Sequence, residues 1–133
     1  MISPTEHGGR GIGATTWIIA DGFIPAESTG PEPAMTSHDS ACILNAGDED
    51  AHAELYIYFA DREPVGPYEL TIPARRAFHQ RLNDLEDPEP MPIGVDYCCV
   101  IRSEVPVVVQ HTRLDSRQAA NALMSTIAYP VQG

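Results

Sequence analysis

The chain has 133 residues, 43% of them hydrophobic, which is enough to bury one core and too few for two. Nineteen Asp and Glu residues outnumber eight Arg and no Lys, and the formal net charge of -11 disfavours nucleic acid as a partner and favours a basic protein surface. The absence of Lys excludes Schiff-base chemistry, P-loop nucleotide binding and Ser-Lys dyads.

Residues 1–15 are rich in Gly and polar side chains and predict a flexible extension ahead of one domain, 16–133. Gly9 to Ala14 fits a loose dinucleotide pattern, but it neither follows a strand nor opens a helix, so we interpret it as part of the extension. The residues Met1 to His7 lack the basic head and apolar run that mark a secretory signal, and no apolar run reaches the roughly 20 residues of a bilayer span. A cytoplasmic location without membrane insertion is expected.

The rest of the chain predicts an all-β fold. Alternation is clearest in the segment from Ala53 to Phe59, as in a half-buried strand. Its apolar face holds Ala53, Leu55, Ile57 and Phe59, and its polar face holds Glu54, Tyr56 and Tyr58. Prolines and glycines separate the apolar segments and exclude long helices. The segments that predict strands are Thr16–Ala20, Ala41–Asn45, Ala53–Phe59, Tyr68–Ile72, Ala77–Leu82, Tyr97–Arg102 and Val105–Thr112.

The tail allows two interpretations. Ser116 is suited to cap a short helix with Ala119, Ala120, Leu123 and Ile127 at helical spacing. Alternatively, the segment Met124–Pro130 forms a closing edge strand.

No pattern in the chain predicts a catalytic residue, a metal site or a cofactor. Asp48–His52 lacks the Gly and the distant Glu of a calcium loop and is more typical of a solvated hairpin turn. Cys42, Cys98 and Cys99 lack the C-x-x-C spacing of a zinc site and predict reduced, buried thiols. Ser103, His111 and Asp115 contain the groups of a catalytic triad but no G-x-S-x-G elbow.

Arginine is concentrated in two polar segments. Arg75 and Arg76 lie at a strand end, and His111, Arg113 and Asp115 surround a strand exit. Arg holds carboxylates and planar polar groups through paired hydrogen bonds, so these five residues predict a polar surface for a partner or ligand. Internal or intersubunit ion pairs are the alternative. Tyr56 and Tyr58 are candidate contact residues, with cross-strand packing as their alternative.

Several long motifs resemble the soluble sensory rhodopsin transducers, from about Thr16 to Tyr129. They are Ile19–Pro25, Gly30–Pro33, Cys42–His52, Glu63–Tyr68, Pro73–Arg76, Arg81–Leu85 and Pro106–Ala119.

This resemblance implies a two-sheet antiparallel β-sandwich, jelly-roll-like, with at most one short helical turn. It also implies a non-enzymatic homotetramer that binds the cytoplasmic side of a membrane photoreceptor, a sensory rhodopsin, and relays its light state. Acidity suits that partner, because cytoplasmic loops of membrane proteins are rich in Lys and Arg. Relatives of the family suggest the alternative of a small-molecule binding module for a carbohydrate or metabolic acid, since a fold does not settle a function.

Overall fold

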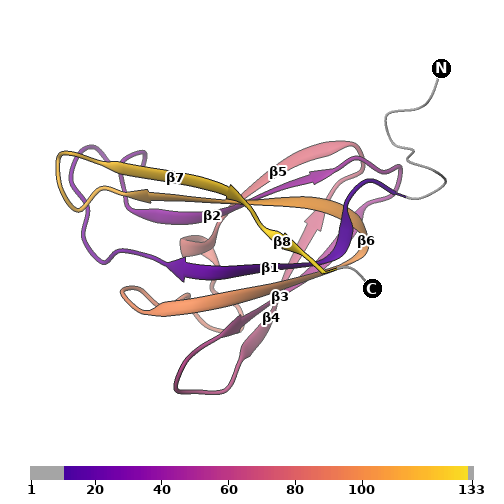
Figure 1. Cartoon of the computed structure of the whole chain (residues 1–133), viewed down its shortest axis with the longest axis horizontal. Coiled ribbons are helices and arrows are strands. Elements are labelled where there is room, and N and C mark those ends of the chain that lie inside the picture. The colour runs from indigo at the N-terminus through magenta and orange to yellow at the C-terminus, as the bar shows by residue number, and fades with distance from the viewer. Residues whose placement is uncertain (1–10, 132–133) are drawn as a thin grey trace.

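The computed structural model describes residues 11–131, which form eight strands and one turn of 3-10 helix (Figure 1). The strands are β1 (Ala14–Phe23), β2 (His38–Asn45), β3 (Ala51–Tyr58), β4 (Val65–Ile72), β5 (Arg76–Arg81), β6 (Asp96–Asp115), β7 (Ala122–Ile127) and β8 (Tyr129–Pro130), and the helical turn is η1 (Leu82–Asp84). None of the helical structure in this range is long and apolar enough to cross a bilayer.

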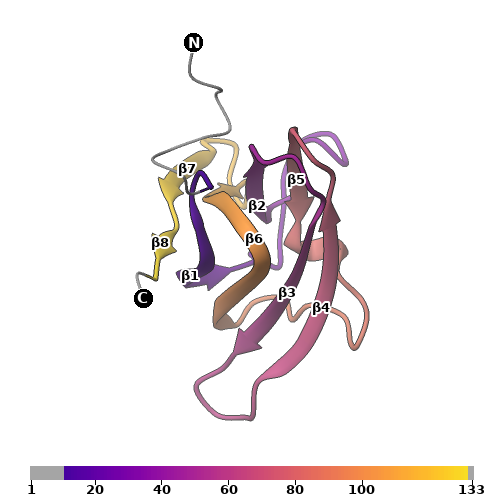
Figure 2. The same cartoon turned by 90° about the vertical axis from the view of Figure 1, so that its right-hand side faces the viewer.

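The strands form two antiparallel sheets packed face to face. The first sheet has the order β4-β3-β6-β1-β8, and the second has the order β5-β2-β6-β7. Figure 2 shows the two layers end-on, with β3 and β4 on one side and β2 and β5 on the other. The predicted all-β, two-sheet sandwich is confirmed.

The long strand β6 belongs to both sheets. Its first part pairs with β3 as far as Ser103 and with β1 as far as Val107, and its second part, from Val108, pairs with β2 and β7. Pro106 lies where β6 passes from one sheet to the other and has no partner in either ladder, so its missing amide hydrogen costs no ladder bond. The two segments predicted as separate strands, Tyr97–Arg102 and Val105–Thr112, are therefore one strand that changes sheets.

Apolar side chains from both sheets fill the space between the layers. In β3, Ala53, Leu55 and Ile57 are buried and Tyr56 is half-buried, which confirms the predicted alternation. Ile101, Val107 and Val109 of β6 and Ile43 of β2 are among the side chains that complete the core. Each such side chain contributes about 1.5–3 kcal/mol through the apolar area it removes from water.

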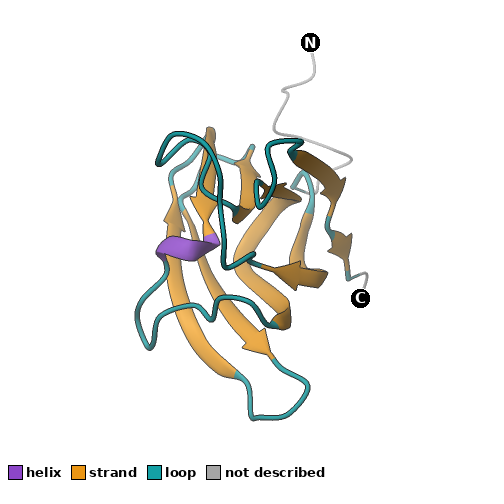
Figure 3. Ribbon diagram, turned by 90° about the vertical axis from the view of Figure 1, so that its left-hand side faces the viewer, coloured by secondary structure: helices purple, strands orange, loops and turns teal. Residues whose placement is uncertain are grey.

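The predicted tail helix is wrong, and the alternative of a closing strand over Met124–Pro130 is correct in kind but not in extent, because the tail forms two strands, Ala122–Ile127 and Tyr129–Pro130, on different sheets. Ala122–Ile127 pairs antiparallel with β6 as β7, because the second part of β6 offers backbone groups that β2 leaves unpaired on its other side. Ser116 caps no helix: it is buried, its amide donates to Ser37 Oγ at 2.9 Å, and its hydroxyl donates to the Met35 carbonyl. Figure 3 shows the helical turn at Leu82–Asp84 instead.

The start of the domain differs slightly from the predicted boundary. Strand β1 begins at Ala14, so the last two residues of the segment predicted as an extension already belong to a strand. Residues 1–10, on which the prediction of flexibility mainly rests, lie outside the described residues. Ala14 opens a strand rather than a helix, in agreement with our rejection of a dinucleotide motif.

Candidate functional site

The most concentrated polar cluster of the structure surrounds the carboxylate of Asp39, which has no exposed surface. Its Oδ1 accepts a 2.9 Å hydrogen bond from Nε of Arg113 and lies 3.2 Å from Nε2 of His111. Its Oδ2 accepts hydrogen bonds from the hydroxyl of Tyr97 at 2.7 Å and from the amide of Phe23 at 2.8 Å. Four groups from two strands, β6 and β1, therefore converge on one carboxylate of β2.

Strand pairing explains this convergence. Asp39 of β2 lies directly opposite Arg113 of β6, and His111 lies two residues from Arg113 and hence on the same face. Tyr97 belongs to the first part of β6 and Phe23 to the end of β1, both in the other sheet. The Asp39 cluster therefore joins the two sheets where their inner faces meet.

Burial works to raise the pKa of Asp39 by penalising the charged carboxylate. The adjacent His111 ring, together with hydrogen bonds from Tyr97, Arg113 and the Phe23 amide, overcomes that effect and holds the pKa below its usual value. Burial, with the negative charge of Asp39 beside it, raises the pKa of Tyr97 far above the usual phenol range. The carboxylate is therefore charged and the phenol neutral throughout the physiological range.

A shallow hollow of about 240 Å³ lies beside the Asp39 cluster, between β1 and the β7–β8 segment. His111 and Asp21 contribute to its lining, together with Thr126 and Tyr129. His111 is only 2% exposed, and its Nε2 is not aligned for a hydrogen bond despite its short distance to Asp39. At the rim, Nη2 of Arg113 donates to the Asp21 carbonyl at 2.6 Å.

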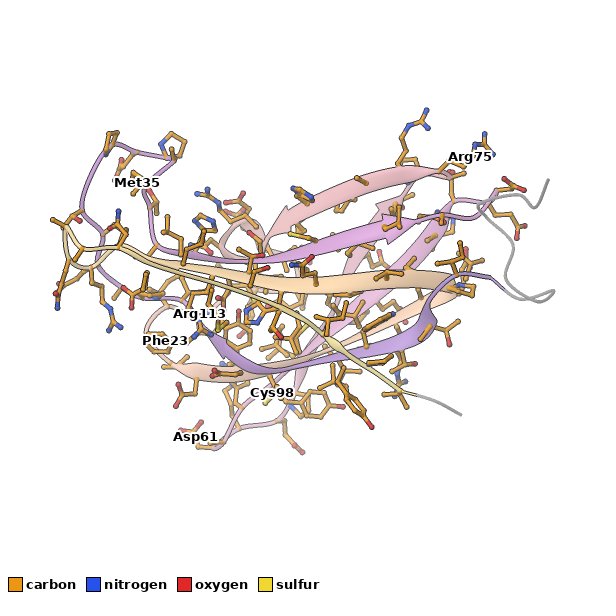
Figure 4. All side chains as sticks on the ribbon, turned by 45° about the horizontal axis from the view of Figure 1, so that its top comes forward. Phe23, Met35, Asp61, Arg75, Cys98 and Arg113 are labelled. Atoms are coloured by element: carbon orange, nitrogen blue, oxygen red, sulfur yellow. The ribbon has the colours of Figure 1, made fainter. Side chains whose placement is uncertain are left out.

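Arg75 and Arg76 lie at the opposite end of β2 from this cluster. Arg76 pairs with Asn45 at one end of β2, and Leu114 pairs with His38 at the other. Seven strand positions separate those ends, a distance of roughly 23 Å at about 3.3 Å per residue. Figure 4 shows Arg75 and Arg113 well apart.

The structure thus does not bring the five predicted polar residues to one surface. Arg75 forms an exposed ion pair with Asp48, with Nη1 2.9 Å from Oδ1, and Arg76 donates to backbone carbonyls. Asp115 is bound by Arg117, whose hydrogen bonds lower the pKa of Asp115. Only His111 and Arg113 share a partner, which is Asp39. Whether any of the five contacts a partner or ligand stays a prediction.

The two tyrosines of β3 differ in their surroundings. The hydroxyl of Tyr56 donates to Glu54 at 3.3 Å, and the guanidinium of Arg102 lies 5.9 Å from the centre of its ring. The contact with Arg102 of β6 is cross-strand packing, given above as the alternative for Tyr56, whereas the contact with Glu54 lies within β3. Tyr58 is 43% exposed at the end of the strand and is the better placed of the two for contact with another molecule.

The groups of the possible triad do not form one. The buried hydroxyl of Ser103 makes no hydrogen bond, His111 faces Asp39, and Asp115 binds Arg117. Within residues 11–131, no three His, Cys, Asp or Glu side chains are grouped so as to hold a metal ion. Cys42, Cys98 and Cys99 are free thiols, but the predicted burial is correct only for Cys99, because Cys42 and Cys98 are half-buried. Burial raises the pKa of Cys99 well above its usual value.

Sequence reasoning missed Asp39 and Tyr97, the two residues that complete the cluster. Asp39 carried a weak signal, because His38-Asp39-Ser40 is a polar group directly ahead of the apolar run Ala41–Asn45. Tyr97 carried none, since an aromatic residue at the start of a strand is typical of ordinary packing.

Comparison with known proteins identifies relatives over nearly the whole described chain. The family model described as Anabaena sensory rhodopsin transducer matches residues 12–130. The solved structure of the Anabaena sensory rhodopsin transducer is 64% identical, with a TM-score of 0.71, over 81% of this chain and 94% of that one. The crystal structure of Thermotoga maritima 1070 is 37% identical, with a TM-score of 0.81, over 92% of this chain and 98% of that one. No curated protein sequence matches the chain.

Proposed function

This chain belongs to the Anabaena sensory rhodopsin transducer family, and from that membership we propose that it is a cytoplasmic signal transducer that binds the cytoplasmic side of a sensory rhodopsin and relays its light state. The observation that carries the proposal is the family match over residues 12–130 together with 64% identity to a protein of that name. The proposed role is binding rather than catalysis, without a cofactor.

The charge of the chain supports this partner. A net charge of -11 with no Lys makes the protein an acidic body, and the cytoplasmic loops of membrane proteins carry an excess of Lys and Arg. Opposite charges on two partners raise the rate of productive encounter and suppress wrong partners.

The proposed assembly is a homotetramer. Strand β7 pairs only with β6 and β8 only with β1 among the described strands, so each leaves one edge free. Leu123, Ile127 and Tyr129 on these strands are 73%, 60% and 66% exposed. Free strand edges and exposed apolar side chains favour association. An isologous contact between copies of the chain covers the edges and the apolar side chains together.

The second candidate is a small-molecule binding module, and the hollow beside His111 is the feature that favours it. Asp21, His111 and Thr126 bring hydrogen-bonding groups to a cavity with apolar walls, as in many ligand sites. Its volume of about 240 Å³ fits a single sugar ring or a small metabolic acid better than a larger molecule. Calorimetric titration with monosaccharides and short carboxylic acids distinguishes this candidate, since binding there must be lost in His111→Ala.

Calorimetry with a purified sensory rhodopsin in detergent tests the leading proposal. Binding is expected at low salt and should weaken as salt rises, because exposed charges are screened over about 8 Å at physiological ionic strength. A receptor whose cytoplasmic Lys and Arg are replaced by Gln is the matched control and should bind weakly at every salt concentration. Absence of binding to the unmodified receptor contradicts the proposal.

A further inference from the structure

Two adjoining hollows form a continuous groove at the end of the sandwich away from Arg75. One, of about 450 Å³, lies between the loops that follow β3 and precede β6, and the other, of about 240 Å³, lies beside the end of β1. They share Phe59, Ala60 and Asp96. Figure 4 shows Phe23, Asp61 and Cys98, which line this groove, on the same side of the molecule. We call it the aromatic groove.

Aromatic and aliphatic side chains form much of the wall of the aromatic groove. Phe23 and Phe59 are half-buried within it, and Tyr58 and Val95 are each 43% exposed at its sides. Clustered aromatic and aliphatic side chains left accessible on a small acidic protein mark a contact surface. Aromatic residues are also enriched where proteins bind one another, because they bury a large area with few rotatable bonds.

The charges around the aromatic groove that have no ion-pair partner are negative. Asp21, Asp61 and Asp96 line it, and none of these three carboxylates forms an ion pair with another described residue. Arg62 already forms an ion pair, with its Nη2 3.0 Å from Oε1 of Glu89. The guanidinium carbon of Arg62 lies 4.9 Å from the centre of the Phe59 ring. The guanidinium carbon of Arg117 lies 5.7 Å from the centre of the Phe23 ring, but Arg117 is paired with Asp115. The groove therefore presents uncompensated negative charge beside apolar surface.

Apolar walls beside unpaired carboxylates indicate which kind of ligand fits the aromatic groove. We propose that the aromatic groove binds a peptide segment of a partner protein in which Lys or Arg flanks an aromatic or long aliphatic side chain. The apolar side chain would pack against Phe59 and Val95, and the cations would pair with Asp61 and Asp96. The inference rests on the proposed function, since the cytoplasmic loops of a rhodopsin are a natural source of such a segment.

Other occupants fit the chemistry less well. Phosphate groups of nucleic acid or of an acidic bilayer would face unpaired carboxylates and be repelled. A second copy of this chain would offer eight Arg, no Lys and nineteen carboxylates, and so few cations to match the groove. A basic foreign segment satisfies both the apolar walls and the charge.

The test titrates isotope-labelled full-length protein with a synthetic twelve-residue peptide of Arg, Lys, Leu and Trp, followed by NMR amide shifts and calorimetry. Shifts should cluster at residues 58–62 and 92–98. Asp61→Asn with Asp96→Asn should weaken binding about tenfold, the loss expected of two partly exposed ion pairs. Val95→Ser, at an exposed position, should weaken binding without lowering the melting temperature.

The matched control removes two carboxylates elsewhere. Glu54→Gln with Glu69→Gln makes the same change of charge in a different hollow, formed by β3 and β4 and lined also by His52 and Glu104. The control should bind the peptide like the wild type. If both double variants weaken binding equally, or if the shifts fall outside the groove, binding follows net charge alone and the inference is overturned.

A parallel measurement with a purified sensory rhodopsin separates this inference from the proposed function. If the receptor binds the wild type and the Asp61→Asn, Asp96→Asn variant equally well, the groove inference fails and the proposed function stands. If the receptor does not bind the wild type while the peptide occupies the groove, the proposed function fails and the groove inference stands. Weakened receptor binding in the groove variant alone supports both.

Discussion

The hydroxyl of Tyr97 donates a 2.7 Å hydrogen bond to Oδ2 of Asp39, and the two residues lie on opposite sheets of the sandwich. Because Oδ1 of the same carboxylate receives Arg113, one buried side chain links both layers. Hydrogen bonds to a charged group contribute about 1.5–3 kcal/mol each, so this link is among the strongest single contributions to the stability of the fold.

Asp39→Asn should lower the free energy of unfolding by about 3–5 kcal/mol, because it removes the charge that Arg113 and His111 face inside the protein. Denaturant unfolding followed by fluorescence of Trp17 measures the loss. Asp48→Asn, whose partner Arg75 is exposed, should change stability by less than about 0.5 kcal/mol. Equal effects of the two substitutions would contradict the role assigned to Asp39.

The stability of the protein should fall in acid, in part through Asp39. Its folded pKa lies below the ordinary 3.8, so the unfolded chain binds a proton more readily. The stabilisation is present in full above the unfolded value and is lost as pH falls through the lower folded one. The free energy of unfolding, measured between pH 7 and pH 2, should therefore change less with pH in Asp39→Asn than in the wild type.

Asp115→Asn is the control for that pH series. Arg117 lowers the pKa of Asp115 as well, but the Asp115 side chain is 25% exposed and its ion pair is screened by solvent. This variant should keep most of the pH dependence of the wild type. If the free energy of unfolding of Asp115→Asn depends on pH as little as that of Asp39→Asn, the surface ion pair, rather than the buried carboxylate, governs acid sensitivity.

Arg113→Ala and Arg75→Ala should behave differently, although the sequence predicts one polar surface for both residues. Loss of the Arg113 hydrogen bond to buried Asp39 should cost about 1.5–3 kcal/mol, measured by thermal or denaturant unfolding. Arg75→Ala should cost less than about 0.5 kcal/mol, because its ion pair is exposed. If both variants are neutral, the Arg113 contact does not stabilise the fold.

Gly22→Ala should destabilise the protein by about 1–3 kcal/mol through overpacking. A Cβ at position 22 would lie 2.3 Å from the ring of Tyr97, whose position sets the hydrogen bond to Asp39. Gly47→Ala is the comparison, since its Cβ would meet only the Asn45 side chain, at 3.3 Å. Melting temperatures of the two variants, recorded together, should rank Gly22→Ala clearly lower.

Leu123→Glu combined with Ile127→Glu should convert the proposed tetramer to monomers. Both side chains are strongly exposed on β7, and added charge opposes association at an apolar edge. Light scattering should give four times the 14.5 kDa chain mass for the wild type and one chain mass for the variant. Ile93→Glu, on the loop ahead of β6, should leave the assembly intact. A wild type that is monomeric at micromolar concentration contradicts the proposal.

Local patterns predicted the strands well where one face is buried. The alternation through Ala53, Leu55 and Ile57 is set by the two-residue period of a strand, and each of these residues is buried. The tail shows where local pattern fails. Leu123 and Ile127 stand at helical spacing, yet the open edge of β6 supplies backbone partners to Ala122–Ile127. Pairing with β6, rather than the spacing of the apolar residues, therefore determines the structure of this segment.

The candidate site was predicted only in part. His111 and Arg113 were identified because polar residues concentrate at the end of a strand, and the structure places both against one carboxylate. Their grouping with Arg75 and Arg76 was wrong in space, since strand direction carries those residues to the other end of β2. Which residues of other strands lie beside each end of β2 is known only once the partner strands and their register are known.

The sequence by itself determined the acidity, the all-β class and the family, because charge, short-period burial and long ordered motifs are written along the chain. Only the tertiary structure decided that β6 serves both sheets and that Asp39 meets Tyr97 and Arg113. Those partners lie 58 and 74 positions away in the sequence. Contacts over such separations arise from sheet register and from the packing of two layers, which no local pattern specifies.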